Sequence, residues 1–293
     1  MGFLEMHAFT VSPPYVSAAE PNLCDPRDAP WFLLGMPHMN GQGLSLTWLL
    51  REAGHLHWWS LAEYTGQQPN SLKDVNGNRA LPGVVACNVS GRSDAFNEDD
   101  VVELVQMQRP SALNGWRSVI ELRATTGAVL SVELVTVFAT RGGSSNHALE
   151  TANMAPELVA ERGTLSSRRT DQIRRLGSTD RRRAEAEMLT PVLSVRISSH
   201  LHFNGVGVAC FAGIHDLFVA AEANANPIPV DDARVETRRL HYFGNLDCGD
   251  MLDIAVRLEE RLIDETNCLV MVSNARRRAD GLVVAVCESV YRR

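Results

Sequence analysis

The sequence predicts an α+β fold made of two similar units in one chain. Three observations support this prediction. A His-x-Asn-Gly-x-Gly motif occurs at residues 38–43 and again at 202–207, a long helix is expected after each copy, and strand-like segments follow each helix. A repeated order of elements is stronger evidence of duplication than a repeated motif alone. We therefore interpret the chain as an internal duplication of one α+β unit.

One long helix is predicted after each motif. Leucines recur mostly at helical intervals in residues 44–62, and Ser45 is placed to cap the first turn. Residues 206–223 are apolar on nearly all sides, which is typical of a helix surrounded by protein. The second helix is therefore expected to be buried.

Antiparallel strands are predicted after both helices. Residues 97–108 and 247–258 each begin after an acidic turn, while residues 118–141 and 268–293 each contain two apolar runs around a glycine turn, as in a hairpin. The equivalent pairs are Asp100 and Asp250, Glu103 and Asp253, and Gly127 and Gly281.

The composition divides the chain into four segments. Between the two units the sequence becomes rich in Gly, Ser, Glu and Arg, which indicates a connection containing a solvated polar helix. The predicted segments are an N-terminal extension at 1–30, a first unit at 31–141, the connection at 142–190 and a second unit at 191–293.

Composition and charge exclude several classes of function. A net charge of −7 argues against broad nucleic-acid binding, and no apolar stretch approaches the length of a membrane span. The six cysteines lack a C-x-x-C spacing, which suits reduced thiols better than disulfides or zinc ligands. The N-terminus lacks the positively charged start of a signal peptide. We expect a cytoplasmic protein without a metal site, a nucleic-acid partner or a membrane partner.

Three segments carry a resemblance to a known family. GMPHMNGQGLSLTWLLREAGHLHW (35–58), FNGVGVACFAG (203–213) and FGNLDCGDML (243–252) resemble the bifunctional acyltransferase/decarboxylase family of polyketide biosynthesis, of the leinamycin-pathway type. The resemblance covers nearly the whole chain except the extreme N-terminus and the connection. It implies a double hot-dog fold, in which each of two tandem units has a long central helix wrapped by an antiparallel β-sheet.

The resemblance also implies a reaction and its partners. Members of the family take methylmalonyl from coenzyme A, decarboxylate it and deliver propionyl to an acyl carrier protein, without a metal or an organic cofactor. The coenzyme A thioester is thus a substrate, and pairing of double hot-dogs predicts a homodimer. A tyrosine is described as carrying the acyl group. Of Tyr15, Tyr64, Tyr242 and Tyr291, Tyr64 is the best candidate because it directly follows the first helix. If the family tyrosine falls within the glycine motif instead, Gln42 or a neighbour replaces it.

The glycine turns are candidate donors to a thioester oxygen. A glycine-rich turn lets the backbone approach a substrate closely, and the first N–H groups of a helix have no partner within the helix. The positive helix end would favour an enolate. The N–H groups of Gly205 and Val206, or of Gly41 and Gln42, are expected to face the oxygen, and Gly43 and Gly207 complete the turns.

Proton delivery and substrate binding have their own candidates. His38, His202 or a water could deliver the proton. Asn204 is a further catalytic candidate. Asn40, Asn204 and Asn245 could bind an amide or carboxylate of the substrate. The same residues also suit a purely structural role, since asparagine often caps a helix and glycine often turns a strand into one.

The arginines offer a binding site for an acidic group. Arg276, Arg277 and Arg278, together with the arginines of the connection, would suit the diphosphate of coenzyme A or an acidic carrier protein. A solvated loop is the alternative.

Three functions remain open from the sequence. An acyltransferase/decarboxylase predicts a deep slot between the two halves with one or both glycine turns at its end. A hot-dog dehydratase or thioesterase acting on carrier-bound or coenzyme A-bound acyl chains is the alternative, although no acid clearly faces His38 or His202 as dehydration requires. A slot closed by side chains would indicate a non-catalytic acyl-binding protein.

Overall fold

The computed structural model describes residues 31–292 except 69, 112–114, 155–164 and 226–233. The first half contains β1 (Trp31–Leu33), β2 (Met39–Asn40), β3 (Gly43–Leu44), α1 (Leu46–Thr65), β4 (Leu81–Ser90), β5 (Val101–Ser111), β6 (Gly115–Ala124), β7 (Val129–Arg141) and β8 (Leu149–Thr151). The second half contains α2 (Leu165–Ala186), β9 (Leu193–Arg196), α3 (Ser199–His202), α4 (Phe211–Ala225), β10 (Arg234–Tyr242), β11 (Met251–Ile263), β12 (Thr266–Arg277) and β13 (Val283–Arg292).

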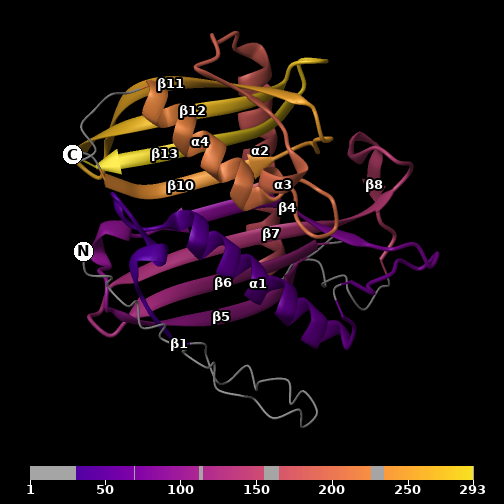
Figure 1. Cartoon of the computed structure of the whole chain (residues 1–293), viewed down its shortest axis with the longest axis horizontal. Helices are drawn as coiled ribbons and strands as arrows, with labels where there is room; N and C mark the ends of the chain where they lie inside the picture. Colours follow the sequence, from indigo (N-terminus) through magenta and orange to yellow (C-terminus); the bar gives the residue numbers. More distant parts are fainter. Residues whose placement is uncertain (1–30, 69, 112–114, 155–164, 226–233, 293) are drawn as a thin grey trace, which may run out of the picture.

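One antiparallel sheet joins the two halves (Figure 1). Its strand order in the described residues is β1-β5-β6-β7-β4-β10-β13-β12-β11-β9, with β8 paired to β7. The two halves of this order match strand for strand, and they meet where β4 pairs with β10. The duplication predicted from the order of the elements is therefore confirmed in the topology.

The duplication extends to individual hydrogen bonds. The carboxylate of Asp100 accepts a hydrogen bond from the N–H of Asn97 at 2.8 Å, and that of Asp250 accepts one from the N–H of Asp247, also at 2.8 Å. Gly127 and Gly281 turn the two hairpins with φ of 94° and 70°, a region that favours glycine. The paired positions found in the sequence thus occupy equivalent places in the fold.

Helices α1 and α4 lie side by side on one face of the sheet (Figure 1). Helix α1 starts as predicted, because the Ser45 hydroxyl accepts a hydrogen bond from the N–H of Trp48 at 3.3 Å. The helices run in opposite directions: the Thr47 hydroxyl bonds to Asp216, while Gly54 lies against the Phe211 ring. Buried apolar residues of both halves form one core between these helices and the sheet.

The start of α4 differs from the prediction. The helix begins at Phe211 and not at residue 206. Residues 203–209 form a tight turn in which Phe203 pairs with Ala209, as β2 pairs with β3 in the first half. Gly207, with φ of 75°, and Gly43, with φ of 100°, allow these turns. The motif therefore encodes a hairpin turn before the helix, not the first turn of the helix itself.

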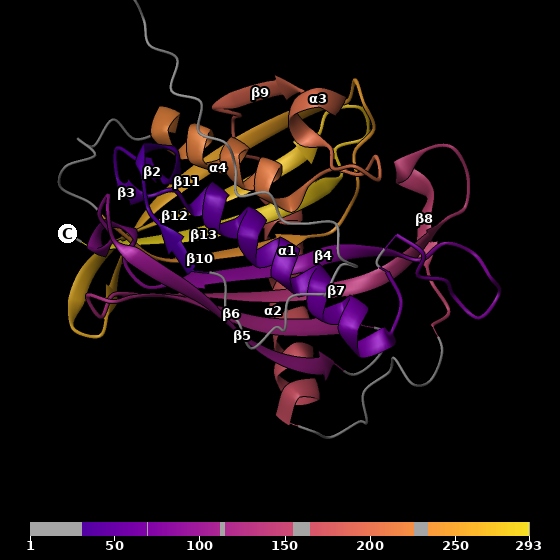
Figure 2. The same cartoon turned by 60° about the horizontal axis from the view of Figure 1, so that its bottom comes forward.

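The polar helix expected in the connection is α2, and it crosses the outer face of the sheet (Figure 2). Its buried residues Thr170, Ile173, Gly177 and Ala184 recur at helical intervals and face the strands. Gly177 permits close approach, because a methyl group there would lie 2.9 Å from the His241 ring. The helix is thus solvated on one side only.

A buried ionic cluster fills the space between α4 and the second half of the sheet. The Glu222 carboxylate accepts hydrogen bonds from Arg238 at 2.7 Å, Ser289 at 2.7 Å and Tyr291 at 2.8 Å. The His215 ring lies 3.1 Å from Arg238. The side chains of Glu222 and Arg238 are each 2% exposed. Their burial is tolerable because the two charged groups are paired and hydrogen-bonded.

Candidate functional site

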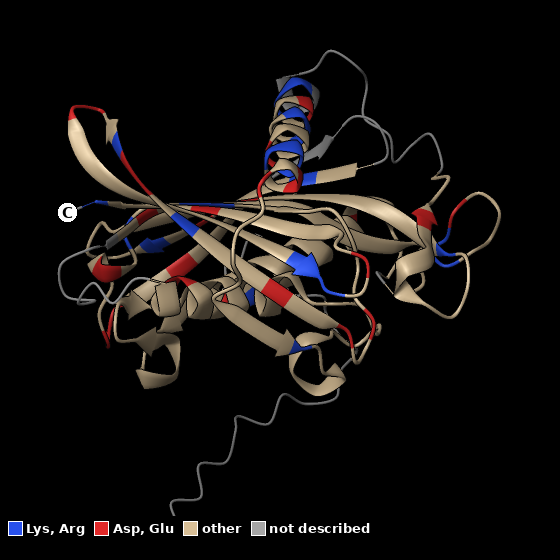
Figure 3. Ribbon diagram, turned by 90° about the horizontal axis from the view of Figure 1, so that it is seen from above, with Lys and Arg blue, Asp and Glu red and all other residues tan. Residues whose placement is uncertain are grey.

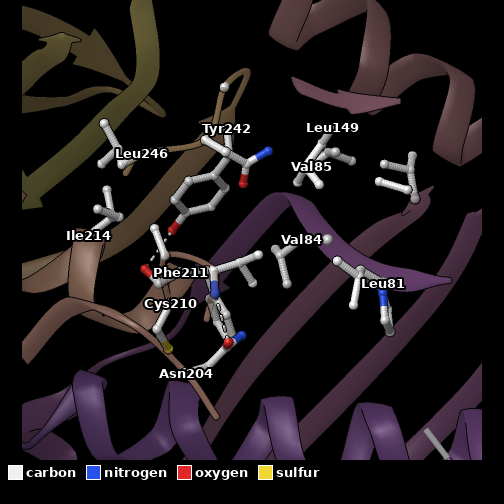
Figure 4. Close-up of a pocket in the computed structure, with 18 of the residues that line it drawn as sticks. Leu81, Val84, Val85, Leu149, Asn204, Cys210, Phe211, Ile214, Tyr242 and Leu246 are labelled. Carbon is white, nitrogen blue, oxygen red and sulfur yellow. Dashed lines mark hydrogen bonds between the residues drawn. The ribbon is translucent and has the colours of Figure 1, made fainter. Parts of the chain in front are cut away.

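A cavity of about 550 Å³ lies at the junction of the two halves. Pairing between β4 and β10 ends at Ala86 and His241, and the next residues, Val85 and Tyr242, both line the cavity (Figure 4). We call the junction between β4 and β10 the seam. At the end of the seam away from the cavity the strands stay together, because the Gly91 N–H bonds to the Glu236 carbonyl at 3.0 Å. The two central strands therefore separate at one end only, and the cavity occupies that separation.

The wall of the cavity is mostly apolar, with a few polar groups. Its apolar lining includes Leu81, Val84, Val85, Phe138, Ile214 and Leu246. The polar lining includes Arg51 and His55 from α1, Asn204, Cys210, Tyr242 and Asn245. Glu150 is the one carboxylate that lines the cavity among the described residues, and it is exposed. An apolar slot with few polar groups is the usual character of a small-molecule site.

The N-terminus of α4 opens onto this cavity. The Cys210 carbonyl accepts the first helical hydrogen bond, from Ile214 at 3.1 Å, and the Cys210 N–H bonds to the His202 carbonyl at 2.7 Å. Cys210 and Phe211 both line the cavity. N–H groups in the first turn of a helix have no partner within the helix, and this end carries partial positive charge. Because Phe211 lines the cavity, its N–H is a candidate donor to an oxyanion beside the Cys210 thiol.

Tyr242 forms part of the wall and fixes the start of α4. Its hydroxyl donates a hydrogen bond to the Phe211 carbonyl at 3.0 Å (Figure 4). Burial raises the pKa of the Tyr242 phenol well above its usual value, and the nearby thiols of Cys87 and Cys287 act in the same direction. The phenol therefore stays protonated, which suits a positioning role better than a nucleophilic one.

The second glycine turn borders the cavity, but not in the way the sequence suggested. The Asn204 side-chain oxygen accepts hydrogen bonds from the N–H groups of Val206 at 3.1 Å and Val208 at 3.2 Å, and Asn204 lines the cavity. The Val206 N–H expected to face a thioester is therefore already bonded. Gly205 is not among the lining residues. The start of α4 is the candidate donor site at this end instead.

The first glycine turn lies outside the cavity lining. The Asn40 side-chain oxygen accepts a hydrogen bond from the Gln42 N–H at 2.8 Å, so this expected donor is also engaged. A Cβ at Gly43 would lie 2.5 Å from the Ser93 carbonyl oxygen, which shows how tightly the turn packs. Gly41 is exposed, with open space around it. This copy of the motif supplies a turn at the closed end of the seam.

The two motif histidines bind the backbone. Nδ1 of His38 accepts a hydrogen bond from the Gly35 N–H at 2.8 Å, and Nδ1 of His202 accepts one from the Ser198 N–H at 3.0 Å. Within the described ranges neither ring contacts a carboxylate. The histidine and acid pair that a dehydratase needs is thus not formed by these histidines.

The remaining predicted residues are divided between the cavity and other places. Asn245 lines the cavity, and its carbonyl accepts a hydrogen bond from Arg277 at 3.1 Å. Tyr64 is 49% exposed at the far end of α1, about 27 Å along the helix from its start. Its ring packs at 5.0 Å from that of Trp116, and it is not among the residues that line the cavity.

The arginines at 276–278 are bonded to other groups of the protein. Arg277 pairs with Asp280 at 2.5 Å, Arg278 pairs with Asp253 at 2.5 Å, and Arg276 bonds to the Glu187 carbonyl at 2.9 Å. None of the three lines the cavity.

Several polar residues of the cavity, among them Cys210, Arg51, His55 and Tyr242, were missed as site residues. Cys210 stands directly before the second helix, and its position relative to the helix start was the available signal. Arg51 and His55 of the first half and Tyr242 of the second meet only at the junction of the halves, so no local pattern identifies them. Among the described residues, no group of three or more His, Cys, Asp or Glu could hold a metal, and no helix is long and apolar enough to cross a membrane.

Comparison with solved structures finds the same fold in proteins that are described as acyl thioesterases. A protein described as an oleoyl thioesterase from Lactobacillus plantarum is 10% identical with a TM-score of 0.64, and it covers 90% of this chain and 94% of its own. A 12:0-acyl-carrier-protein thioesterase from Umbellularia californica is 11% identical, with a TM-score of 0.58 and coverage of 90% and 93%. An acyl-carrier-protein thioesterase from Bacteroides thetaiotaomicron is 8% identical, with a TM-score of 0.57 and coverage of 90% and 96%.

These similarities confirm the predicted double hot-dog fold. No protein-family model and no curated protein sequence matches the chain. At such low identity the similarity establishes the architecture, while the reaction has to be argued from the site.

Proposed function

We propose that the protein is an enzyme that cleaves acyl thioesters in the cavity between its two halves. The observation that carries this proposal is the N-terminus of α4, with Cys210 at its start, opening onto an apolar cavity of about 550 Å³. That volume lies within the range of small-molecule sites, about 300 to 1,000 Å³. The solved structures with this fold that are described as acyl thioesterases add support.

The substrate orientation follows from the wall of the cavity. The thioester oxygen would accept hydrogen bonds from N–H groups in the first turn of α4, where negative charge is favoured. The acyl chain would lie along Val84, Phe138 and Ile214, and Asn204 or Asn245 would bind an amide of the pantetheine arm. This retains two of the three asparagines predicted to bind substrate.

The reaction can be written as two thioester steps. Sγ of Cys210 attacks the carbonyl carbon, the bond to the carrier sulfur breaks, and the thiol proton leaves with the released carrier thiol. Water then attacks the acyl group on Cys210, which gives the free acid and restores the thiol. The carrier is coenzyme A or an acyl carrier protein.

Acyl transfer with decarboxylation is the second candidate. Within the described residues, the cavity lining has no buried carboxylate to act as a base, and the departure of carbon dioxide from a malonyl-type thioester needs none. The donors at α4 would hold the resulting enolate. In this case a carrier thiol, not water, would take the acyl group.

The first test is acylation of Cys210. Wild-type protein is incubated with acyl-coenzyme A, and the free acid and the mass of the intact protein are measured. We expect an acyl adduct on the peptide containing Cys210, and a loss of at least about 100-fold in turnover for Cys210→Ala. Cys248→Ala is the matched control, since Cys248 is exposed and outside the cavity lining. Full turnover by Cys210→Ala would exclude the covalent route.

The second test separates hydrolysis from transfer. Methylmalonyl-coenzyme A and a holo-acyl carrier protein are mixed with the enzyme, and the carrier is analysed by mass spectrometry. Free acid with an unloaded carrier supports hydrolysis. A propionyl load on the carrier supports transfer with decarboxylation, and an unchanged diacid load supports transfer alone.

A further inference from the structure

We propose that the outward face of α2 is the docking surface for an acidic carrier protein that delivers the thioester. This inference rests on the proposed function, because it assumes that the substrate is attached to a protein. It concerns a surface on the opposite side of the sheet from α1 and α4 (Figure 3).

The charge of α2 is opposite to that of the chain. The helix carries seven arginines and three acids, whereas the chain as a whole has a net charge of −7. Figure 3 shows these arginines as blue bands on the helix at the top of the view. A local positive surface on an acidic protein attracts a negatively charged partner and orients its approach.

Three of the arginines form a row along the exposed side of α2. Arg168, Arg175 and Arg182 are seven residues apart and all exposed, opposite the buried Ile173 and Gly177. Residues seven apart lie nearly on one line of a helix, with about 10.5 Å between neighbours. The row therefore spans about 21 Å, which suits contact with one helix or one acidic face of a small protein.

The row is available for a partner. The guanidinium groups of Arg168 and Arg175 have no hydrogen-bond or ion-pair partner in the part of the chain that the structure describes, and Arg182 contacts only residues of its own helix. By contrast, Arg169 pairs with Glu133 and Arg183 with Glu259. The arginines that face the sheet hold the helix in place, and the outward row does not.

The helix crosses the sheet directly outside the cavity. Ile173 packs against Ala86 and Val85, where pairing between β4 and β10 ends. The Arg181 guanidinium lies 5.7 Å from the centre of the Phe243 ring. Val85 and Phe243, which contact α2 in this way, both also line the cavity. A carrier held on α2 would thus sit over the place where the central strands separate.

An acidic protein fits this surface better than a nucleic acid or a membrane. The sequence of α2 contains no aromatic side chain to stack on bases or enter a lipid interface, and Leu176 is the one exposed large apolar residue among the helix residues whose side chains are described. The negative charge of the rest of the chain would repel an extended phosphate surface. A compact acidic partner can contact the row alone.

The test compares two triple variants that change the net charge equally. One replaces the row by Arg168→Gln, Arg175→Gln and Arg182→Gln. The control replaces exposed arginines elsewhere, by Arg92→Gln, Arg123→Gln and Arg292→Gln, whose side chains are 62%, 47% and 45% exposed. Turnover is measured with a decanoyl-loaded acyl carrier protein and with decanoyl-pantetheine, at low and at high salt.

The expected result is a rise of about ten-fold in KM for the carrier substrate in the row variant alone, with decanoyl-pantetheine turnover unchanged. Wild-type KM for the carrier should rise with salt, and that of the row variant should change less. An equal KM for the carrier in all three proteins would overturn the docking proposal. So would binding of RNA or anionic vesicles that depends on the row while carrier turnover does not.

The two proposals can fail separately. If wild-type protein cleaves neither substrate, the proposed function is wrong, and docking is then judged by titrating a fluorescently labelled holo-carrier protein. Weaker binding by the row variant alone would still support the docking surface. Equal binding by all three proteins would overturn it.

Discussion

At the scale of single residues, burial decides what each polar group can do. His57 on α1 is fully buried, with its ring nitrogens 2.8 Å from the Ser118 hydroxyl and 3.3 Å from the Thr136 hydroxyl. Burial without an opposite charge disfavours the protonated ring and lowers the pKa of His57 from 6.5 to about 3. Glu222 is also buried, but its carboxylate is paired with the Arg238 guanidinium at 2.7 Å. We therefore expect different responses to mutation at His57 and at Glu222.

The first prediction concerns the pH dependence of stability. Below pH 6.5 the unfolded chain binds a proton at His57 that the folded protein refuses, so stability is lost as the pH falls from 6.5 towards about 3. The loss is about 1.4 kcal/mol per pH unit. His57→Gln should remove this contribution and flatten the curve, as measured by urea unfolding at several pH values. His55→Gln, an exposed neighbour on the same helix, should retain the wild-type slope. Identical slopes for all three proteins would contradict the burial argument.

The second prediction concerns the ionic cluster under α4. Glu222→Gln leaves Arg238 buried without its counter-charge, which should lower the free energy of unfolding by about 3 to 5 kcal/mol. Glu121→Gln is the control, because Glu121 pairs with Arg123 near the surface and such pairs contribute less than about 1 kcal/mol. Chemical denaturation measures both. A similar small loss for the two variants would mean that the cluster is relaxed or hydrated.

At the scale of elements, the same motif produces two turns with different surroundings. The first turn packs against the backbone of residues 93 and 94, which follow β4. A Cβ at Gly207 would instead meet one close atom, the end of the Arg141 side chain at 3.4 Å. The tight packing accompanies the closed end of the seam, and the looser turn borders the cavity. Equivalent local sequences therefore have different roles because of what lies against them.

The third prediction tests this difference in the first turn. Gly43→Ala places a methyl group 2.5 Å from the Ser93 carbonyl at a φ of 100°, and should destabilise the protein by about 2 to 4 kcal/mol. Gly41→Ala, two residues away with nothing within 4 Å, should change stability by less than about 0.5 kcal/mol. Thermal and urea unfolding of the two variants provide the measurement. Equal stability would show that the turn can move away from residues 93 and 94.

At the scale of the whole molecule, the two halves share one sheet and one apolar core. The sheet is continuous across β4 and β10, and one apolar core contains side chains from both halves. Leu240 on β10 is fully buried at the seam, where it faces Cys87 on β4 and Cys287 on β13 in the strand registers. Neither half can expose its side of this seam without loss of buried apolar surface.

The fourth prediction is a single unfolding transition. All five tryptophans lie between residues 31 and 116, so their fluorescence follows the first half, while far-UV circular dichroism follows both. The two signals should give the same midpoint. Leu240→Ala, in the second half, should lower both midpoints together, with a loss of about 2 to 5 kcal/mol. A fluorescence midpoint that stays at the wild-type value would show that the halves unfold separately.

The sequence by itself determined the duplicated order of elements, the hairpin that ends each half and the capped start of α1. These features depend on local signals, namely apolar periodicity, turn glycines such as Gly127 and Gly281, and the Ser45 cap. Equivalent positions such as Asp100 and Asp250 could be paired for the same reason.

Only the tertiary structure decided where the candidate site lies. Whether β4 and β10 stay paired or separate depends on contacts between halves that are distant in the chain, such as the bond from Gly91 to Glu236. Because the seam opens at one end alone, Asn204 borders the cavity while its counterpart Asn40 does not, and Cys210, which the sequence places just before a helix, comes to line the cavity. Local patterns specify the elements, whereas the cavity results from the non-local register between them.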